Sequence, residues 1–310
     1  MKLSLFSTLR GYRKEYLPKD IFSGIIIAAV SIPISMGYAQ ISGIPAVYGL
    51  YGSVLPILLF ALFSTSRQFI FGVDAAPAAI VGGALSTLSI AAESEAAMDY
   101  VPAIALFAGL WLFIFFLLHA DKIVDFISTP VMGGFISGIA VTIILMQIPK
   151  LMGSPAGSGE LLELTEHIFA AAKNISWLSL FMGLGTLVLI RTFKKLAPKF
   201  PMAIVIMALG VLSTIVFHVD EKGVVLLQSV ERGLPSLMIP DFGNVDLTQA
   251  AGRGLMVAVV IMAETLLAEN TFAFRNDYKL NDRQEILACA AGNIAAAAVG
   301  CCPVNGSVSR

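Results

Sequence analysis

Two short stretches, Gly72–Pro77 and Cys302–Ser307, interrupt long apolar runs with glycine, proline and polar side chains, residue types that suit ion binding. A helix that begins at such a break presents unpaired N–H groups and about half a positive charge, which attract an anion. The shift of 230 residues that superposes the two breaks also aligns Ser23–Ile32 with Arg253–Met262. Paired breaks at corresponding places of a repeat are typical of the midplane substrate site of a secondary transporter.

Two carboxylates lie beside or within these apolar stretches. Asp74 belongs to the first break, and Glu264 stands in the apolar run Met262–Ala268. Because a carboxylate inside a membrane is costly, its presence indicates a function by default. The alternative for Asp74 is an N-cap, a position for which Asp is favoured. Glu269 and Asn270 lie further along the same run, and we place them nearer the membrane interface.

The remaining residue types give no sign of bond-making chemistry or of a cofactor. The sequence offers no nucleophile paired with a base, so we predict that the protein is not an enzyme. The histidines lie near span ends or in loops and the cysteines share one apolar region, without the spacing of metal or haem ligands. We interpret them as loop and packing residues: His119, His167, His218, Cys289, Cys301 and Cys302. Neither a metal nor another cofactor is predicted.

Composition indicates an integral membrane protein. Hydrophobic residues make up 57% of the chain, charged residues 13%, and the mean hydropathy is +0.85. Soluble domains carry about 25% charged residues, so the lipid bilayer is the expected surrounding of this chain. The net charge of −1 argues against nucleic acid as a partner, because no basic stripe is available to neutralise phosphates.

Nine hydrophobic segments approach or exceed the length of about 20 helical residues that crosses a bilayer. Basic residues gather before the first segment and in the 191–199 and 273–285 loops, whereas the 92–100 loop is acidic. The positive-inside rule therefore predicts a multi-pass protein of the cell membrane with its N-terminus in the cytoplasm. This orientation requires the segment that begins at residue 72 to enter the membrane partly as an extended stretch. The segments are residues 20–40, 46–63, 72–91, 102–118, 130–151, 176–190, 201–217, 253–272 and 284–300.

Three motifs resemble those of the SulP sulfate-permease family. They are the segment Pro33–Tyr51 with its Gly-Leu-Tyr ending, the element Thr65-Ser66-Arg67, and the element Gly306-Ser-Val-Ser-Arg310. The resemblance covers essentially the whole chain. It implies an all-α polytopic membrane protein with two inverted seven-span repeats and two half-spanning broken helices, in which a transport core moves against a gate. It usually also implies a cytoplasmic STAS domain after the last span.

On this pattern the chain holds only the first repeat and the start of the second. Residues 1–19 form a cytoplasmic segment, 20–220 the first repeat with spans one to seven, 221–252 an extracytoplasmic loop, and 253–310 spans eight, nine and the beginning of ten. We therefore expect an incomplete chain that lacks the later spans and any STAS domain. Spans one to four and eight onward are expected in the core, and spans five to seven in the gate.

The resemblance places the anion between the opposed N-termini of the third and tenth spans. Ser307, Ser309 and Arg310 match the pocket side of the tenth span, where hydroxyl groups and a permanent guanidinium charge would meet anion oxygens. Helix capping or packing between spans is the alternative for the two serines, and packing is the alternative for the aromatic residue on the first span. The predicted anion-binding residues are Tyr38, Asp74, Ala75, Ser307, Ser309 and Arg310.

Asp74 departs from the family pattern, in which a small or aromatic neutral residue usually follows Gly-Pro, and Val73 replaces the proline. With Arg310 as the counter-charge, Asp74 and Glu264 leave the site at about −1 when all three groups are ionised. A proton or Na⁺ that arrives with the anion would offset this charge. We therefore predict cation-coupled uptake, with Glu264 and Asp74 as the residues that hold the proton or coupling ion.

The sequence thus predicts a secondary active transporter of small anions of sulfate, bicarbonate or carboxylate type, working by alternating access. An anion exchanger or channel of the same family and a nucleobase permease of the same fold are the alternatives. Glu264 would suit hydrogen bonds to the ring N–H groups of a nucleobase, but the Gly306–Arg310 element argues against that substrate. Homodimer formation is left open.

Overall fold

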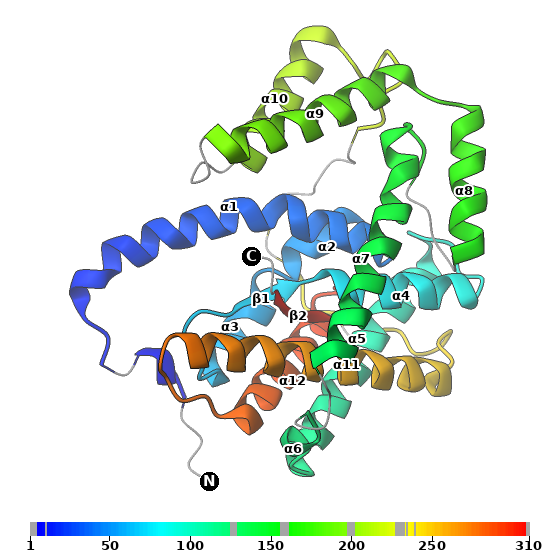
Figure 1. Ribbon diagram of the computed structural model, residues 1–310. Helices are drawn as coiled ribbons and strands as arrows, with labels where there is room; N and C mark the ends of the chain where they lie inside the picture. Colours follow the sequence, from blue (N-terminus) through cyan, green and yellow to red (C-terminus); the bar gives the residue numbers. More distant parts are fainter. Residues whose placement is uncertain are drawn as a thin grey trace.

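The computed structural model describes residues 5–9, 11–124, 129–155, 161–196, 202–226, 233, 235–238 and 240–307. Its elements are almost all helices, and one short pair of strands lies near the middle of the molecule (Figure 1). Two 3₁₀ turns, Ser7–Leu9 and Lys14–Tyr16, precede the first long helix. The predicted all-α class is therefore confirmed.

The first two apolar segments form a helical hairpin. Helix α1 (Leu17–Ile41) is followed by α2 (Ala46–Tyr51), which packs against it, and by α3 (Leu55–Phe63), which packs mainly against α12. Gly43 makes the turn with φ +83°, a left-handed conformation that glycine adopts without steric cost. A Cβ on Gly49 would lie 2.1 Å from the carbonyl oxygen of Ser35, so a glycine there lets α2 touch α1.

The two polar interruptions pair with each other as antiparallel strands. Strand β1 (Ile70–Val73) leads into α4 (Ala75–Thr87), and β2 (Val304–Ser307) follows α12 (Asp282–Ala298). The register matches Ile70 with Ser307 and Val73 with Val304. Within a membrane a strand must find backbone partners, and here each break supplies them for the other. The pair lies between α1 and the two helices α11 and α12 (Figure 1).

Helices α5 (Glu95–Leu117), α11 (Leu247–Arg275) and α12 pack together around this strand pair and form the main buried core. Their first turns are capped by side chains, as the sequence allows: the Ser94 hydroxyl accepts from Ala97 N–H and the Asp246 carboxylate from Thr248 N–H. A Cβ on Gly254 of α11 would lie 2.6 Å from Phe107, so small residues set the spacing of these helices.

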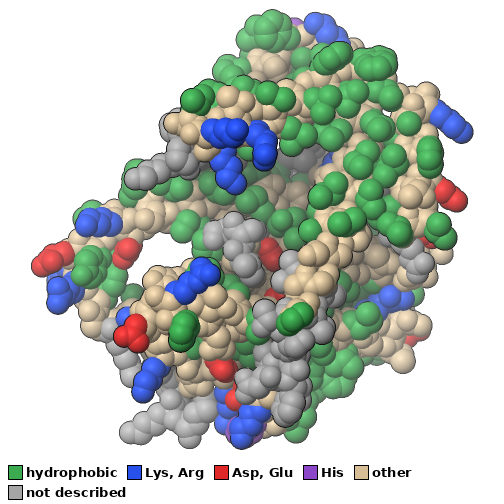
Figure 2. Space-filling model, in the orientation of Figure 1, with side chains coloured by type: hydrophobic (Ala, Val, Ile, Leu, Met, Phe, Trp, Pro, Cys, Tyr) green, Lys and Arg blue, Asp and Glu red, His purple; other side chains and the backbone are tan. Residues whose placement is uncertain are grey.

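The short helix α6 (Asp121–Val124) packs against α11 and α12. The remaining helices form a second group, α7 (Thr129–Leu151), α8 (Leu161–Lys173), α9 (Trp177–Leu196) and α10 (Met202–Phe217). Helices α9 and α10 lie side by side, away from the strands, in Figure 1. Hydrophobic side chains cover much of their surface in Figure 2, with Lys194 and Lys195 in the last turn of α9. An exposed apolar face of this kind suits contact with lipid.

Within the described ranges, five helical segments are long and apolar enough to cross a membrane: Lys14–Ile41, Ala46–Phe63, Glu95–Leu117, Trp177–Leu196 and Leu247–Arg275. Shorter apolar helices occupy Ala75–Thr87, Ser137–Leu151 and Val205–Phe217. The predicted segment 72–91 combines part of β1 with the short helix α4, as its entry by an extended stretch requires. The division at residues 220 and 252 stays a prediction.

Candidate anion site

Strand pairing brings the start of α4 beside strand β2. Asp74 directly follows β1 and takes the N-cap position of α4, with φ −131° and ψ 165°. Its side chain makes no capping hydrogen bond. Asp74 therefore occupies the predicted N-cap position, but its carboxylate does not cap the helix. Ala75 is the first residue of α4, and its backbone N–H belongs to the positive end of that helix.

Glu264 of α11 enters the same region from the opposite side. Its Oε2 accepts a hydrogen bond of 2.7 Å from Nδ2 of Asn305, in strand β2. Asp74 and Glu264 are each 8% exposed, and their charges act on one another. The structure therefore brings together the two acids that were expected to hold a proton or cation.

Asn305 and Thr265 complete this cluster and were not predicted. The Thr265 hydroxyl donates to Oδ1 of Asn305 at 2.7 Å, so the amide of Asn305 is fixed with its Nδ2 toward Glu264. Both side chains are buried. An asparagine inside an apolar stretch is the one sequence signal that points to Asn305.

A second asparagine holds strand β2 in place. Asn293 of α12 accepts the Val304 N–H at 3.0 Å and donates to the Val304 carbonyl at 3.0 Å. The same Nδ2 also donates to the Cys289 carbonyl at 2.9 Å. Both backbone groups of Val304 thus have a fixed partner, and the chain leaves α12 along a defined line toward the site.

The other predicted site residues are placed to different degrees. Ser307 is buried at the end of β2, opposite Ile70. Tyr38 is partly buried on α1 and packs against both buried hydrophobic clusters. Ser309 and Arg310 lie outside the described residues, so their part in the site stays a prediction. In α11, Glu269 is fully buried within the protein, and its expected position near the membrane interface stays a prediction.

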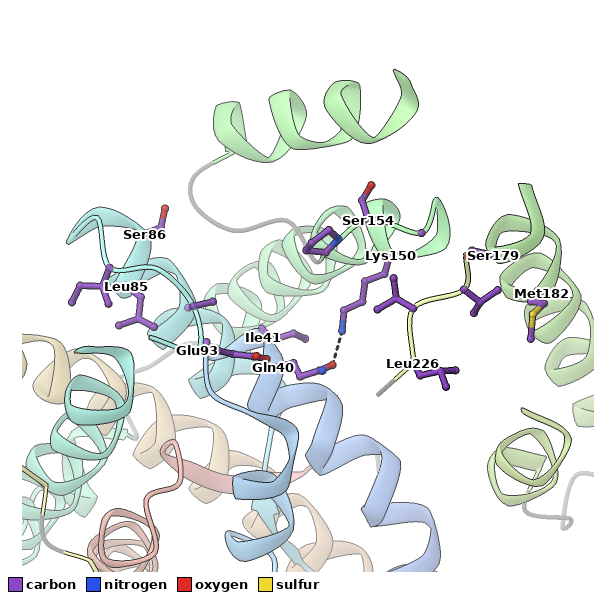
Figure 3. A pocket seen from close by; sticks show the side chains of 18 residues that line it. Gln40, Ile41, Leu85, Ser86, Glu93, Lys150, Ser154, Ser179, Met182 and Leu226 are labelled. Carbon is purple, nitrogen blue, oxygen red and sulfur yellow. Dashed lines mark hydrogen bonds between the residues drawn. The ribbon is translucent and has the colours of Figure 1, made fainter. Parts of the chain in front are cut away.

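A cavity of about 700 Å³ lies at the far end of α4, away from Asp74. It is bordered by residues of α1, α4, α7 and α9, and therefore separates the strand-containing group of helices from the second group (Figure 3). Nζ of Lys150, at the end of α7, donates to Oε1 of Gln40, near the end of α1, across 2.8 Å. This hydrogen bond, drawn in Figure 3, joins the two groups.

Known proteins are similar to this chain in sequence. A probable sulfate transporter of Mycobacterium tuberculosis is 26% identical over 97% of this chain and 54% of the relative. Sulfate transporter 4.1, chloroplastic, of Arabidopsis thaliana is 30% identical over 98% of this chain and 45% of its own length. The chain thus spans about half the length of these curated relatives.

Solved structures agree on the fold. The transmembrane domain of the cyanobacterial bicarbonate transporter BicA superposes with a TM-score of 0.82 at 19% identity, covering 96% of this chain and 76% of that domain. The murine Slc26a9 anion transporter, in its inward-facing state, superposes with a TM-score of 0.84 at 17% identity, covering 98% of this chain and 54% of that one.

The fold is therefore shared with these transporters over the matched regions, and the protein is a multi-pass membrane protein. The family model described as the sulfate permease family matches residues 17–310, nearly the whole chain. The three motifs that resemble SulP proteins lie within this matched range. The chain belongs to the sulfate permease family.

Proposed function

We propose that the protein is a secondary active transporter of small anions, with its substrate site at the β1–β2 pair. One observation carries the proposal: the pairing of the two strands sets the start of α4 against Glu264 and Asn305. The backbone N–H groups at the start of α4 supply the positive end of a helix dipole, which favours an anion. The relatives named above are described as sulfate, bicarbonate and anion transporters, which supports the same substrate class.

The anion in this proposal is held by the residues that the sequence assigned to it. Ser307 and Ser309 supply hydroxyl donors, the N–H of Ala75 supplies a backbone donor, and Arg310 supplies a permanent charge. Tyr38 approaches from α1. Sulfate is tetrahedral, and bicarbonate and carboxylate groups are planar. All three present negatively charged oxygens that can accept hydrogen bonds from such a set of donors.

Uptake in this proposal is coupled to H⁺ or Na⁺ through Asp74 and Glu264. Both carboxylates repel an anion when ionised, and the Asn305 amide donates a hydrogen bond to Glu264. A proton or Na⁺ that binds between the acids removes part of this repulsion before or as the anion enters. The cation and the anion therefore favour each other's binding, which is the energetic basis of symport.

Transport by alternating access needs two bodies that move against one another. The strands, α1 to α5, α11 and α12 form one body in this proposal, and α7, α9 and α10 belong to the other. The Lys150–Gln40 hydrogen bond joins them beside the 700 Å³ cavity and would have to break when that side opens. The bilayer supports both bodies, with the N-terminus in the cytoplasm, and a homodimer is compatible with the exposed apolar faces.

Uptake into proteoliposomes tests the proposal. We expect accumulation of sulfate, bicarbonate or a dicarboxylate above the outside concentration when an inward H⁺ or Na⁺ gradient is imposed. Flux that only follows the anion's own gradient would identify a channel, and flux that requires an anion on the opposite side would identify an exchanger. Preferred uptake of uracil would replace the anion with a nucleobase.

Arg310 variants test the anion site itself. Arg310→Ala should sharply weaken uptake, whereas Arg310→Lys should retain part of it, because a point charge remains although the guanidinium fork is lost. Ser307→Ala should cost about 1 kcal/mol of anion binding, which corresponds to roughly five-fold in affinity. Unchanged anion affinity in folded Arg310→Ala protein would remove Arg310 from the site.

A further inference from the structure

A second pair of acids, Glu269 and Glu285, is buried outside the proposed anion site. Glu269 lies five residues after Glu264 on α11, about 7.5 Å along the helix, and its side chain is 0% exposed. In the part of the chain that the structure describes, neither of its carboxyl oxygens meets a hydrogen-bond donor. A carboxylate in this position would lack both water and protein donors, which is a very unfavourable state for a charge.

Glu285, in the first turn of α12, has the opposite environment although it is also 0% exposed. Its Oε2 accepts from the Ser64 hydroxyl at 2.7 Å, and its Oε1 accepts from the N–H of Thr65 at 2.5 Å and also from the Thr65 hydroxyl. Three donors that all point at one carboxyl group are the surroundings of an ionised carboxylate. Glu285 therefore carries the negative charge of the pair.

The two carboxyl groups lie near enough to act on one another, where α11 and α12 pack together. Two acceptors cannot form a hydrogen bond with one another unless one of them carries a proton. Because Glu285 already receives three donors and Glu269 receives none, the asymmetry assigns the proton to Glu269.

The neighbouring charged groups do not offer another way to neutralise the pair. Among the residues that the structure describes, the other titratable groups that act on it are Asp282 and Cys289, both on α12, and neither brings a positive charge. Arg283, at the start of α12, donates to the Phe116 carbonyl and lies over its ring. Arg67, in the loop before β1, lies over the ring of Tyr278, and Arg275 is exposed at the end of α11, six residues beyond Glu269.

We propose that Glu269 and Glu285 form a proton-binding site in which Glu269 carries one proton and donates it to the ionised carboxylate of Glu285. This site is separate from Asp74 and Glu264. It stands whether or not anion uptake is coupled to a cation, since it rests on the described geometry of α11, α12 and the loop before β1.

The proton affects the stability of the loop that connects α3 to β1. Glu285 holds Ser64 and Thr65, the residues through which the chain passes from α3 toward the strand that ends at the anion site. Loss of the proton would set two negative charges against one another beneath this connection. The protonated pair therefore fixes strand β1 to the start of α12.

Infrared spectroscopy of the protein in detergent tests the proposal, because a protonated carboxyl group has a carbonyl band distinct from that of a carboxylate. At pH 7 we expect this band to lose one component in Glu269→Gln. Glu163→Gln is the matched control, since Glu163 on α8 accepts an exposed hydrogen bond from Ser86 and should leave the band unchanged. The component should also persist in Glu264→Gln, which separates this site from the coupling acids.

Thermal unfolding of the same variants adds an independent measurement. Glutamine has the shape of a protonated glutamate and can donate its N–H to Glu285, so Glu269→Gln should fold with a Tm close to that of the parent. Glu285→Gln should unfold at a lower temperature than Glu269→Gln, because three donors lose a charged acceptor.

An unchanged infrared band in Glu269→Gln would overturn the proposal, and so would failure of that variant to fold. A band that appears only when Na⁺ is withdrawn would show that the pair holds a metal cation in place of the proton, which also contradicts it.

Discussion

At the scale of single residues, the proposed site contains two buried acids whose charges act on one another. Asn305 donates one amide hydrogen bond to Glu264, while Asp74 stands at the start of α4 without a capping bond from its side chain. An anion that enters this region gains from the helix end and loses from both carboxylates. The balance between these effects depends on whether a cation is bound, so charge-neutral variants should separate them.

Glu264→Gln should bind anions but no longer couple them to a cation gradient. The amide oxygen of Gln can still accept from Asn305, while the exchangeable charge is lost. Uptake by the variant should not change when the H⁺ or Na⁺ gradient is removed, whereas uptake by the parent should fall. In the parent, uptake should strengthen as external pH decreases if the cation is H⁺, and should follow Na⁺ at fixed pH if it is Na⁺.

Asp74→Asn serves as the partner variant. It should bind anions at least as tightly as the parent, because one repulsive charge is gone. Full gradient dependence in Glu264→Gln, together with simple destabilisation in Asp74→Asn, would mean that both acids are structural. Radiolabelled anion binding, measured beside uptake, distinguishes the two results.

At the scale of elements, close backbone contact places α4 against α1. A Cβ on Gly82 would lie 2.2 Å from the carbonyl oxygen of Ile41, whereas a Cβ on the next residue, Gly83, meets nothing within 4 Å. Two adjacent glycines thus have different roles, and only Gly82 is required for the contact. The contact sets where α4, and therefore Asp74, lies relative to the first span.

Gly82→Ala should destabilise the protein by about 1–3 kcal/mol, because the backbone of α1 must move to admit the methyl group. Gly83→Ala is its control and should be neutral or stabilising by up to about 1 kcal/mol, since alanine favours a helix interior. Thermal unfolding in detergent compares the two variants. Equal Tm values would contradict the packing that the structure shows between α4 and α1.

The pair of hydrogen bonds between Asn293 and Val304, which we call the Asn293 clip, is a second contact between elements. Asn293→Ala leaves the N–H and carbonyl of Val304 without their partner and should cost about 1–3 kcal/mol. Asn270→Ala on α11 is the matched control, because Asn270 is exposed and should change stability by less than about 0.5 kcal/mol. Anion affinity should fall in Asn293→Ala as well, and an unchanged affinity and Tm would exclude the clip as a support of the site.

Some of these structural features could be predicted from the sequence, and others could not. The breaks at Gly72 and Cys302 are visible because glycine, proline and polar residues stand out in apolar runs, and the repeat indicated that they correspond. That they pair as antiparallel strands was not predicted. The Asn293 clip and the acid pair Glu269–Glu285 were not predicted either, because both depend on which face of one helix meets another. Glu264 and Glu269 are five residues apart and so point to different sides of α11, which no hydropathy pattern reveals.

At the scale of the whole molecule, two groups of helices meet across a cavity and are joined there by Lys150 and Gln40. The first group contains the strands and most of the buried core, while the second exposes long apolar faces and in α9 has no buried residue among those described. A hydrogen bond between the two groups biases their relative position, because opening the cavity requires its loss.

Lys150→Met should therefore shift the protein toward the form in which this cavity is open. A cysteine introduced at Ser179, which lines the cavity, should react faster with a water-soluble maleimide in the Lys150→Met background. Lys150→Arg keeps a donor and should react at nearly the parent rate, and Lys173→Met on α8 controls for loss of a surface charge. An unchanged labelling rate in Lys150→Met would show that the bond does not hold the groups together.

The four-residue ladder between β1 and β2 also bears on how this protein can change over generations. Side chains alternate along a strand, so inserting or deleting one residue in either strand turns every later side chain to the opposite face. A change of this kind at the start of β2 would turn Asn305 away from Glu264 and take Val304 from Asn293. Many enzymes gain new specificity through changes in loop length. At this site we expect changes in strand length to be disfavoured, because they would disrupt the β1–β2 register. We therefore expect new substrate preferences to arise by replacing side chains at fixed chain length.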